Sequence, residues 1–222
     1  MEEEMLSANP LEFKVIANNI GYLKINNFVG IKSYKMDFDS IYKKILPTDG
    51  LIIDVRENVG GWTDISLYIL KHFTNKPFKT GKWRSPNNIA AHRSWGSNIE
   101  WFESEEYEEI PFDNRIIYTN PMVLLADEST FSCAENFCVD FLTINRGKMV
   151  GAKTAGSSGN PIMFNLPGDG VALVCTKQDF FPDGREFVGL GITPDIEVKP
   201  TIIDIIKNND PVLQVAVKEI LK

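Results

Sequence analysis

The chain has 222 residues, 43% of them hydrophobic and 11% aromatic, which is enough for one large domain with a substantial core. The net charge of −7, with no cluster of Lys and Arg, argues against a nucleic-acid or anionic-membrane partner. No apolar run is long enough to span a bilayer, and no signal-peptide pattern follows Met1.

The cysteines give a weak indication of the redox state of the compartment in which the protein functions. Cys133, Cys138 and Cys175 cannot all pair within one chain, which favours a reducing environment. None of them lies in a metal-ligand spacing, so we expect no metal and no other cofactor. As written, the chain is expected to be cytoplasmic; a segment ahead of Met1 with a signal would instead make it an exported or cell-envelope protein.

The first half of the chain alternates between strand and helix patterns. Residues 20–28 alternate between apolar and polar, which predicts an opening strand, and residues 37–46 predict a helix that Pro47 ends. A buried strand over 51–55 and a helix over 64–73 follow. Residues 81–114 are rich in Trp, Ser, Asn and acidic side chains and predict an irregular insertion over the active face; the sequence does not predict whether it acts as a lid.

The second half continues the alternation and then adds a hairpin. A buried strand is predicted over 122–126, a helix over 133–145 and a strand over 148–152. Two strands over 162–166 and 171–176 form the hairpin, and Asp210 with Pro211 predicts the start of a C-terminal helix over 210–222. We therefore predict a single α/β domain over 1–222, built from layers of sheet and helices.

Ser132 is the most informative residue, because it sits where the strand over 122–126 turns into the next helix. A hydroxyl at a helix N-terminus lies near unpaired N–H groups and the positive end of the dipole, which suits a nucleophile. The plainer interpretation is an N-cap serine, with Glu135 three residues later closing a capping box. Taken alone, the motif favours the cap.

A second strand-to-helix turn carries the adjacent glycines Gly60 and Gly61. Glycines allow backbone N–H groups to approach a substrate closely, which is one way to build an oxyanion hole. The alternative is an ordinary turn. Together with Ser132, however, the pair supplies a nucleophile and electrophile-stabilising donors, as acyl transfer requires.

Six short motifs, read in order, resemble the tail-specific (carboxyl-terminal-processing) serine peptidases, together with the tricorn core protease and the interphotoreceptor retinoid-binding proteins. They are residues 20–25, 51–56 with Asn58 and the glycine pair, 130–135, 150–156, 182–184 and 189–195. The resemblance spans about 18–200, which would be the family core. It implies a ClpP/crotonase-like α/β fold and peptide hydrolysis by a serine.

By this resemblance Ser132 matches the nucleophile, and the backbone N–H groups of Gly60, Gly61 and Cys133 match the oxyanion hole. Residues 189–195 match a closing strand that borders the site. Asp54 and Arg56 we interpret as an ion-paired part of the scaffold rather than as catalytic residues.

The general base is the feature that departs from the family. The lysine of tail-specific members is replaced by Ser157, and the histidine of the tricorn branch belongs well upstream of the first strand. His92 is the replacement we name; His72, expected at the surface or half-buried, and Lys153 are weaker candidates. The tricorn branch also carries an acid shortly before the closing segment; Val188 stands near that position here, and Glu186 is the substitute we name. The leading expectation is a base outside these residues.

Three hypotheses follow from the residues and the resemblance. The first is the catalytic domain of a serine endopeptidase that acts on extended polypeptide through a Ser132 acyl-enzyme. The second is a non-catalytic peptide- or ligand-binding domain on the same fold, which the missing base favours. The third, a coenzyme A-dependent enzyme, rests on fold analogy alone. The sequence does not predict the oligomeric state.

Overall fold

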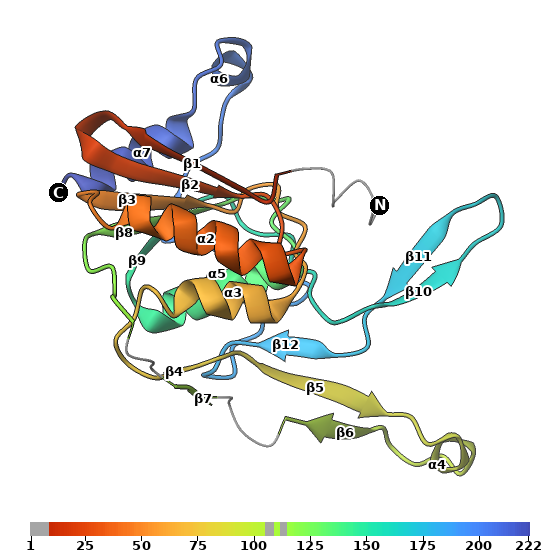
Figure 1. Cartoon of the computed structure of the whole chain (residues 1–222). Helices are drawn as coiled ribbons and strands as arrows, with labels where there is room; N and C mark the ends of the chain where they lie inside the picture. The colour runs from red at the N-terminus through yellow and green to blue at the C-terminus, as the bar shows by residue number, and fades with distance from the viewer. Residues whose placement is uncertain (1–8, 105–108, 112–114) are drawn as a thin grey trace.

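A six-stranded sheet is the centre of the part of the chain that the structure describes (Figure 1). The computed structural model describes residues 9–104, 109–111 and 115–222. The spatial order is β1 (Leu11–Ile16), β2 (Ile20–Ile25), β3 (Gly50–Asp54), β8 (Met122–Ala126), β9 (Gly147–Gly151) and β13 (Ile196–Glu197). β1 is antiparallel to β2, and the other neighbours are parallel. The parallel strands therefore end at the same edge.

Helices cover both faces of this sheet (Figure 1). One face carries α2 (Ile31–Ile45), α3 (Thr63–Leu70) and α5 (Cys133–Ile144), and the other carries α7 (Pro211–Ile220). Successive side chains of a strand point to opposite faces, so Ile53 packs in the core under the three helices and Ile52 in the core under α7. Each such buried aliphatic side chain stabilises the fold by about 1.5–3 kcal/mol.

Smaller strand pairings among the described residues lie outside the central sheet. One sheet has the order β12 (Gln178–Phe180), β5 (Lys82–Asn87), β6 (Glu100–Glu103); the others are β4 (Phe78–Lys79) with β7 (Glu109–Ile110), and β10 (Ile162–Asn165) with β11 (Val171–Val174). The short helices are η1 (Ala17–Asn19), α4 (Ala90–Ser94) and α6 (Ile202–Ile206). The β10–β11 hairpin projects from the body, and α4 sits at the far end of the β5–β6 pair (Figure 1).

The predicted strands over 51–55 and 122–126, the helix over 133–145 and the hairpin are confirmed as β3, β8, α5 and β10–β11. Other boundaries shift: the first predicted strand ends at Ile25, and the helix predicted from residue 37 already begins at Ile31. β1 was missed.

Two expectations about irregular and regular structure are wrong. Residues 81–114 are not irregular throughout, because β5 and β6 pair in antiparallel register there. Residues 189–195 form a turn and a loop rather than a closing strand, and the short β13 follows them. The strand expected at 189–195 thus lies one segment later in the chain.

A buried ion pair joins β3 to α7. Asp54 is fully buried at the end of β3, and its carboxylate lies 2.6 Å from the guanidinium of Arg56, as predicted. Arg56 also pairs at 2.9 Å with Asp210, whose side chain caps α7. Burial acts to raise the pKa of Asp210, but hydrogen bonds from Arg56 and from the backbone outweigh it and hold that pKa below its usual value.

We expect Arg56→Ala to lower the free energy of unfolding by about 3 kcal/mol, because it removes the main partner of a fully buried carboxylate. Urea unfolding followed by circular dichroism measures the change. Lys199→Ala, which removes an ion pair between two exposed side chains, is the control and is expected to stay within about 0.5 kcal/mol of the wild type. Equal effects of the two substitutions would contradict the structural role of Arg56.

Candidate active site

Ser132 occupies the N-cap position of α5 in a strained backbone conformation. Its φ of 57° and ψ of −124° lie outside the helical and strand regions, which for a residue with a side chain costs about 1–3 kcal/mol and is typical of functional sites. The Ser132 carbonyl accepts from the N–H groups of Glu135 and Asn136, at 2.8 and 3.2 Å. The hydroxyl makes no capping hydrogen bond, so the predicted capping box is wrong.

Glu135 has a different role, because its carboxylate holds the loop over residues 154–157. It accepts hydrogen bonds from the Thr154 hydroxyl at 2.6 Å and from the N–H groups of Gly156 and Ser157, both at 2.7 Å. Burial raises the pKa of Glu135, and these hydrogen bonds oppose that rise. The loop in turn reaches Ser132, whose N–H donates to the Ser157 carbonyl at 3.0 Å.

The glycine turn lies directly against the serine. A Cβ atom on Gly60 would lie 2.9 Å from the Ser132 Cβ and 2.8 Å from the Cys133 nitrogen, so no side chain fits there. The Gly60 N–H is already used, since it donates to the Asn58 side chain at 2.8 Å. Gly61 lies beside Phe28 in an isolated bridge. In this bridge the Phe28 N–H donates to the Gly60 carbonyl and the Trp62 N–H donates to the Phe28 carbonyl, so the Gly61 N–H takes no part.

A cleft of about 410 Å³ opens beside Ser132. We call it the Ser132 cleft; its lining includes Gly61, Trp83, Ser132, Cys133, Asn136, Ser158 and Lys177. Cys133 is the first residue of α5, so its N–H has no acceptor within the helix. Ser132, Cys133 and Gly61 thus border the same cleft. Gly60 does not line it but lies against the backbone of Cys133 and the Cβ of Ser132.

The residues considered as bases are not brought to this cleft. His92 lies on α4 at the end of the β5–β6 pair (Figure 1), with its ring tilted against that of Trp95 and the ring centroids 5.8 Å apart. His72 is 6% exposed rather than at the surface or half-buried, and its ring packs among aromatic side chains. Lys153 and Glu186 are exposed, and neither lines the Ser132 cleft.

Sequence reasoning missed a polar cluster on the wall of the cleft. The Lys177 amine donates to Asp179 at 2.6 Å, and the buried Ser158 hydroxyl donates to the same carboxylate at 2.8 Å. Lys177 and Asp179 are two residues apart on one extended segment, so their side chains share a face. That spacing was a usable signal. Lys177 is the basic side chain among the described residues that line the Ser132 cleft.

The thiol next to Ser132 does not compete as a nucleophile. Burial raises the pKa of Cys133 to about 12, with hydrogen bonds to Ser66 and Thr63 opposing the rise, so the thiol is protonated at neutral pH. All three cysteines are free. Over the ranges that the structure describes, no group of three or more His, Cys, Asp or Glu side chains is placed to hold a metal ion. No helix within those ranges is long and apolar enough to cross a bilayer.

The fold defines the class: this is an α/β domain of the ClpP/crotonase-like type. The chain belongs to peptidase family S41, whose model matches residues 19–198. The carboxy-terminal-processing protease of Bartonella bacilliformis is 22% identical over 219 residues, which cover 95% of this chain and 45% of that protein. The chain spans less than half the length of the curated relatives it matches.

Solved structures agree on the fold. A putative peptidase from Parabacteroides merdae matches with a TM-score of 0.77 and 21% identity, over 100% of this chain and 69% of that one. Mature CPAF in complex with lactacystin matches with a TM-score of 0.70 and 19% identity, over 94% and 53% of the two chains. The resemblance found from the motifs is therefore confirmed at the level of family and fold.

We expect Glu135→Gln to lower the free energy of unfolding by about 2 kcal/mol, because charge-assisted hydrogen bonds to a buried acceptor are lost. A glutamine side chain would also place its NH₂ group where a carboxylate oxygen accepted, so that it faces a donor of Thr154, Gly156 or Ser157. Hydrogen exchange of the Gly156 and Ser157 amides should accelerate, and urea unfolding gives the stability. Glu128→Gln, on an exposed side chain, is the matched control. Unchanged exchange in the 154–157 loop would contradict the anchoring role.

Proposed function

We propose that this chain is the catalytic domain of a serine endopeptidase that cleaves extended polypeptide. Ser132 Oγ attacks the carbonyl carbon of a peptide bond and forms an acyl-enzyme, which water then hydrolyses. The observation that carries the proposal is the strained Ser132, whose hydroxyl caps nothing and whose cleft also holds Cys133 and Gly61. A cleft of about 410 Å³ suits a few residues of an extended chain rather than a folded domain.

Stabilisation of the tetrahedral intermediate would come from the backbone. The N–H of Cys133 and that of Gly61 are the donors of the proposed oxyanion hole, and the N-terminus of α5 adds its positive partial charge. Gly60 has a supporting role in this scheme, because its N–H is engaged by Asn58 and a side chain there would collide with Ser132.

Activation of Ser132 requires a general base, and the described residues offer the least support for this step. Ser157 stands where the tail-specific relatives carry their lysine, and the Lys177 amine is held by Asp179. Serine without a general base is a poor nucleophile at neutral pH. We therefore propose that the base comes from outside the described residues, and that the chain on its own reacts slowly.

Fluorophosphonate labelling tests the nucleophile. We expect slow labelling of the wild-type chain at Ser132, located by mass spectrometry, and none in Ser132→Ala. Ser129→Ala is the matched control, because Ser129 is an exposed serine on the same turn and should leave labelling unchanged. Labelling that survives in Ser132→Ala would refute the assignment. Rapid labelling of the wild type would show that a base lies within the chain, with Lys177 the first residue to substitute.

Ser157→Lys should accelerate labelling of Ser132 by at least about tenfold, since a general base contributes about 10²–10⁴ when well placed. The Ser157 carbonyl already accepts from the Ser132 N–H at 3.0 Å, so a lysine side chain at 157 begins beside the nucleophile. Ser157→Met, which has a long side chain without an amine, is the control and should not gain reactivity. A gain in both variants would mean that space, not a base, limits the reaction.

A further inference from the structure

A second hollow adjoins the Ser132 cleft along α5. We call it the Asp140 pocket; it has a volume of about 190 Å³ and shares Thr63, Trp83, Asn136 and Lys177 with the cleft. Asn136 lies four residues after Ser132 and four before Asp140, so the three positions follow one face of the helix. The two hollows therefore adjoin each other along α5, from the nucleophile toward Asp140, and we call the two together the groove.

Asp140 is a buried carboxyl group with an unused oxygen. Its side chain is 2% exposed, and its Oδ1 has no hydrogen-bond partner in the part of the chain that the structure describes. Burial raises the pKa of Asp140 well above its usual range, and a hydrogen bond from the Gly81 backbone opposes that rise. Buried polar atoms without partners are rare, and one that lines a pocket marks a place for a donor from outside the protein.

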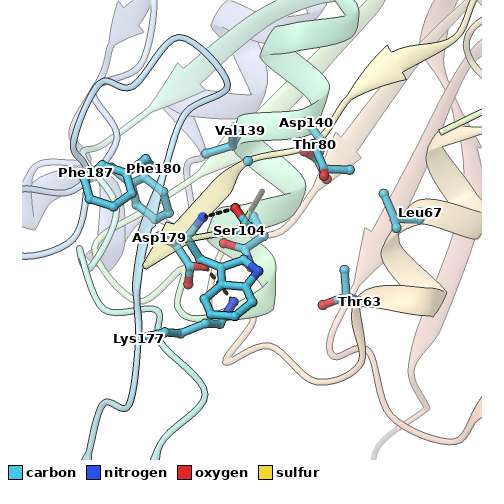
Figure 2. A pocket seen from close by; sticks show the side chains of 13 residues that line it. Thr63, Leu67, Thr80, Ser104, Val139, Asp140, Lys177, Asp179, Phe180 and Phe187 are labelled. Carbon is cyan, nitrogen blue, oxygen red and sulfur yellow. Dashed lines mark hydrogen bonds and ion pairs between the residues drawn. The ribbon is translucent and has the colours of Figure 1, made fainter. Parts of the chain in front are cut away.

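The walls of the Asp140 pocket suit an aliphatic stem. Figure 2 shows Phe180 and Phe187 on one side and Leu67 on the other, with Asp140 and Lys177 at separate ends. The volume is below the range of sites for drug-sized ligands and fits one side chain. Ser132 and Asp140 are eight residues apart, about 12 Å along the helix axis, so only a long side chain reaches from a scissile bond to the carboxyl.

The charges around the pocket favour a cation over an anion. Lys177 is neutralised by its 2.6 Å ion pair with Asp179, which itself lines the pocket. Asp140 is the remaining acid of the lining, and an arriving cation would bind its ionised form. A lysine or arginine also buries its methylene stem against apolar walls while its charged end finds a partner.

We propose that the Asp140 pocket is a specificity subsite that accepts a lysine or arginine side chain of the polypeptide substrate, with Asp140 as its acceptor. This inference rests on the proposed function. The subsite binds through its own residues, however, so its selectivity is measurable as peptide binding even where no bond is cleaved.

The test uses capped hexapeptides of alanine in which one variable residue occupies each position in turn. Binding to the wild-type chain is measured by calorimetry for lysine, arginine, norleucine and glutamate as the variable residue. We expect the lysine or arginine peptide to bind at least about tenfold more tightly than the norleucine peptide at one position, because a charge-assisted hydrogen bond contributes about that factor in affinity. Equal binding, or preference for glutamate, would overturn the proposal; the latter would assign recognition to Lys177.

Asp140→Asn keeps the shape of the side chain and should abolish this preference while leaving the norleucine peptide unaffected. Asp183→Asn, on an exposed carboxylate outside the pocket, is the control and should keep the preference. A preference that persists in folded Asp140→Asn overturns the assignment. The wild-type series stands without the variant, should it fail to fold. Absent labelling of Ser132 in Ser157→Lys would instead be a failure of the proposed function.

Discussion

The buried carboxylate of Glu135 is the interaction on which the site depends. It receives one hydroxyl and two backbone N–H groups from the 154–157 loop, and so fixes that loop against the first turn of α5. The loop then supplies the Ser157 carbonyl that accepts from the Ser132 N–H. This anchor acts together with backbone hydrogen bonds of the same loop, such as the one from the Ala155 N–H to the Thr130 carbonyl at 3.1 Å, to position residue 157 beside Ser132. The acid therefore acts on geometry rather than on the proton of the nucleophile.

Parallel strand order explains why two distant turns meet. β3 and β8 are neighbours in the sheet, and the glycine turn and the Ser132 turn each follow one of them. Carboxyl ends of parallel strands share an edge, which is where sites form in such sheets. The contact is tight enough to exclude any side chain from Gly60. The Arg56 network lies at the end of β3 as well and ties this edge to α7 through Asp210.

The sequence was most informative where a local pattern decides the structure. Ser132, Gly60 and Gly61 lie on the turns that follow two strongly apolar strands, so it was predictable that these turns lie close together. The spacing of Ser132 and Glu135 predicted a capping box, but the Ser132 hydroxyl makes no capping hydrogen bond, and the Glu135 carboxylate also accepts from a loop 21 residues away in sequence. β1, the edge strand of the sheet, was not predicted. Lys177 and Asp140 come together at the groove through tertiary packing, for which the two-residue spacing of Lys177 and Asp179 was only a local signal.

Two local defects lie on the same helix, and their positions argue for a common purpose. Ser132 holds an unfavourable backbone conformation at the start of α5. Eight residues further along the helix, a buried oxygen of Asp140 has no hydrogen-bond partner among the described residues. Each costs stability, the first through backbone strain and the second through an unpaired buried polar atom. Such departures from local consistency are expected at functional sites. A substrate that fills the groove would engage the hydroxyl at one end and satisfy the carboxyl at the other, so α5 carries both the proposed chemistry and the proposed selectivity.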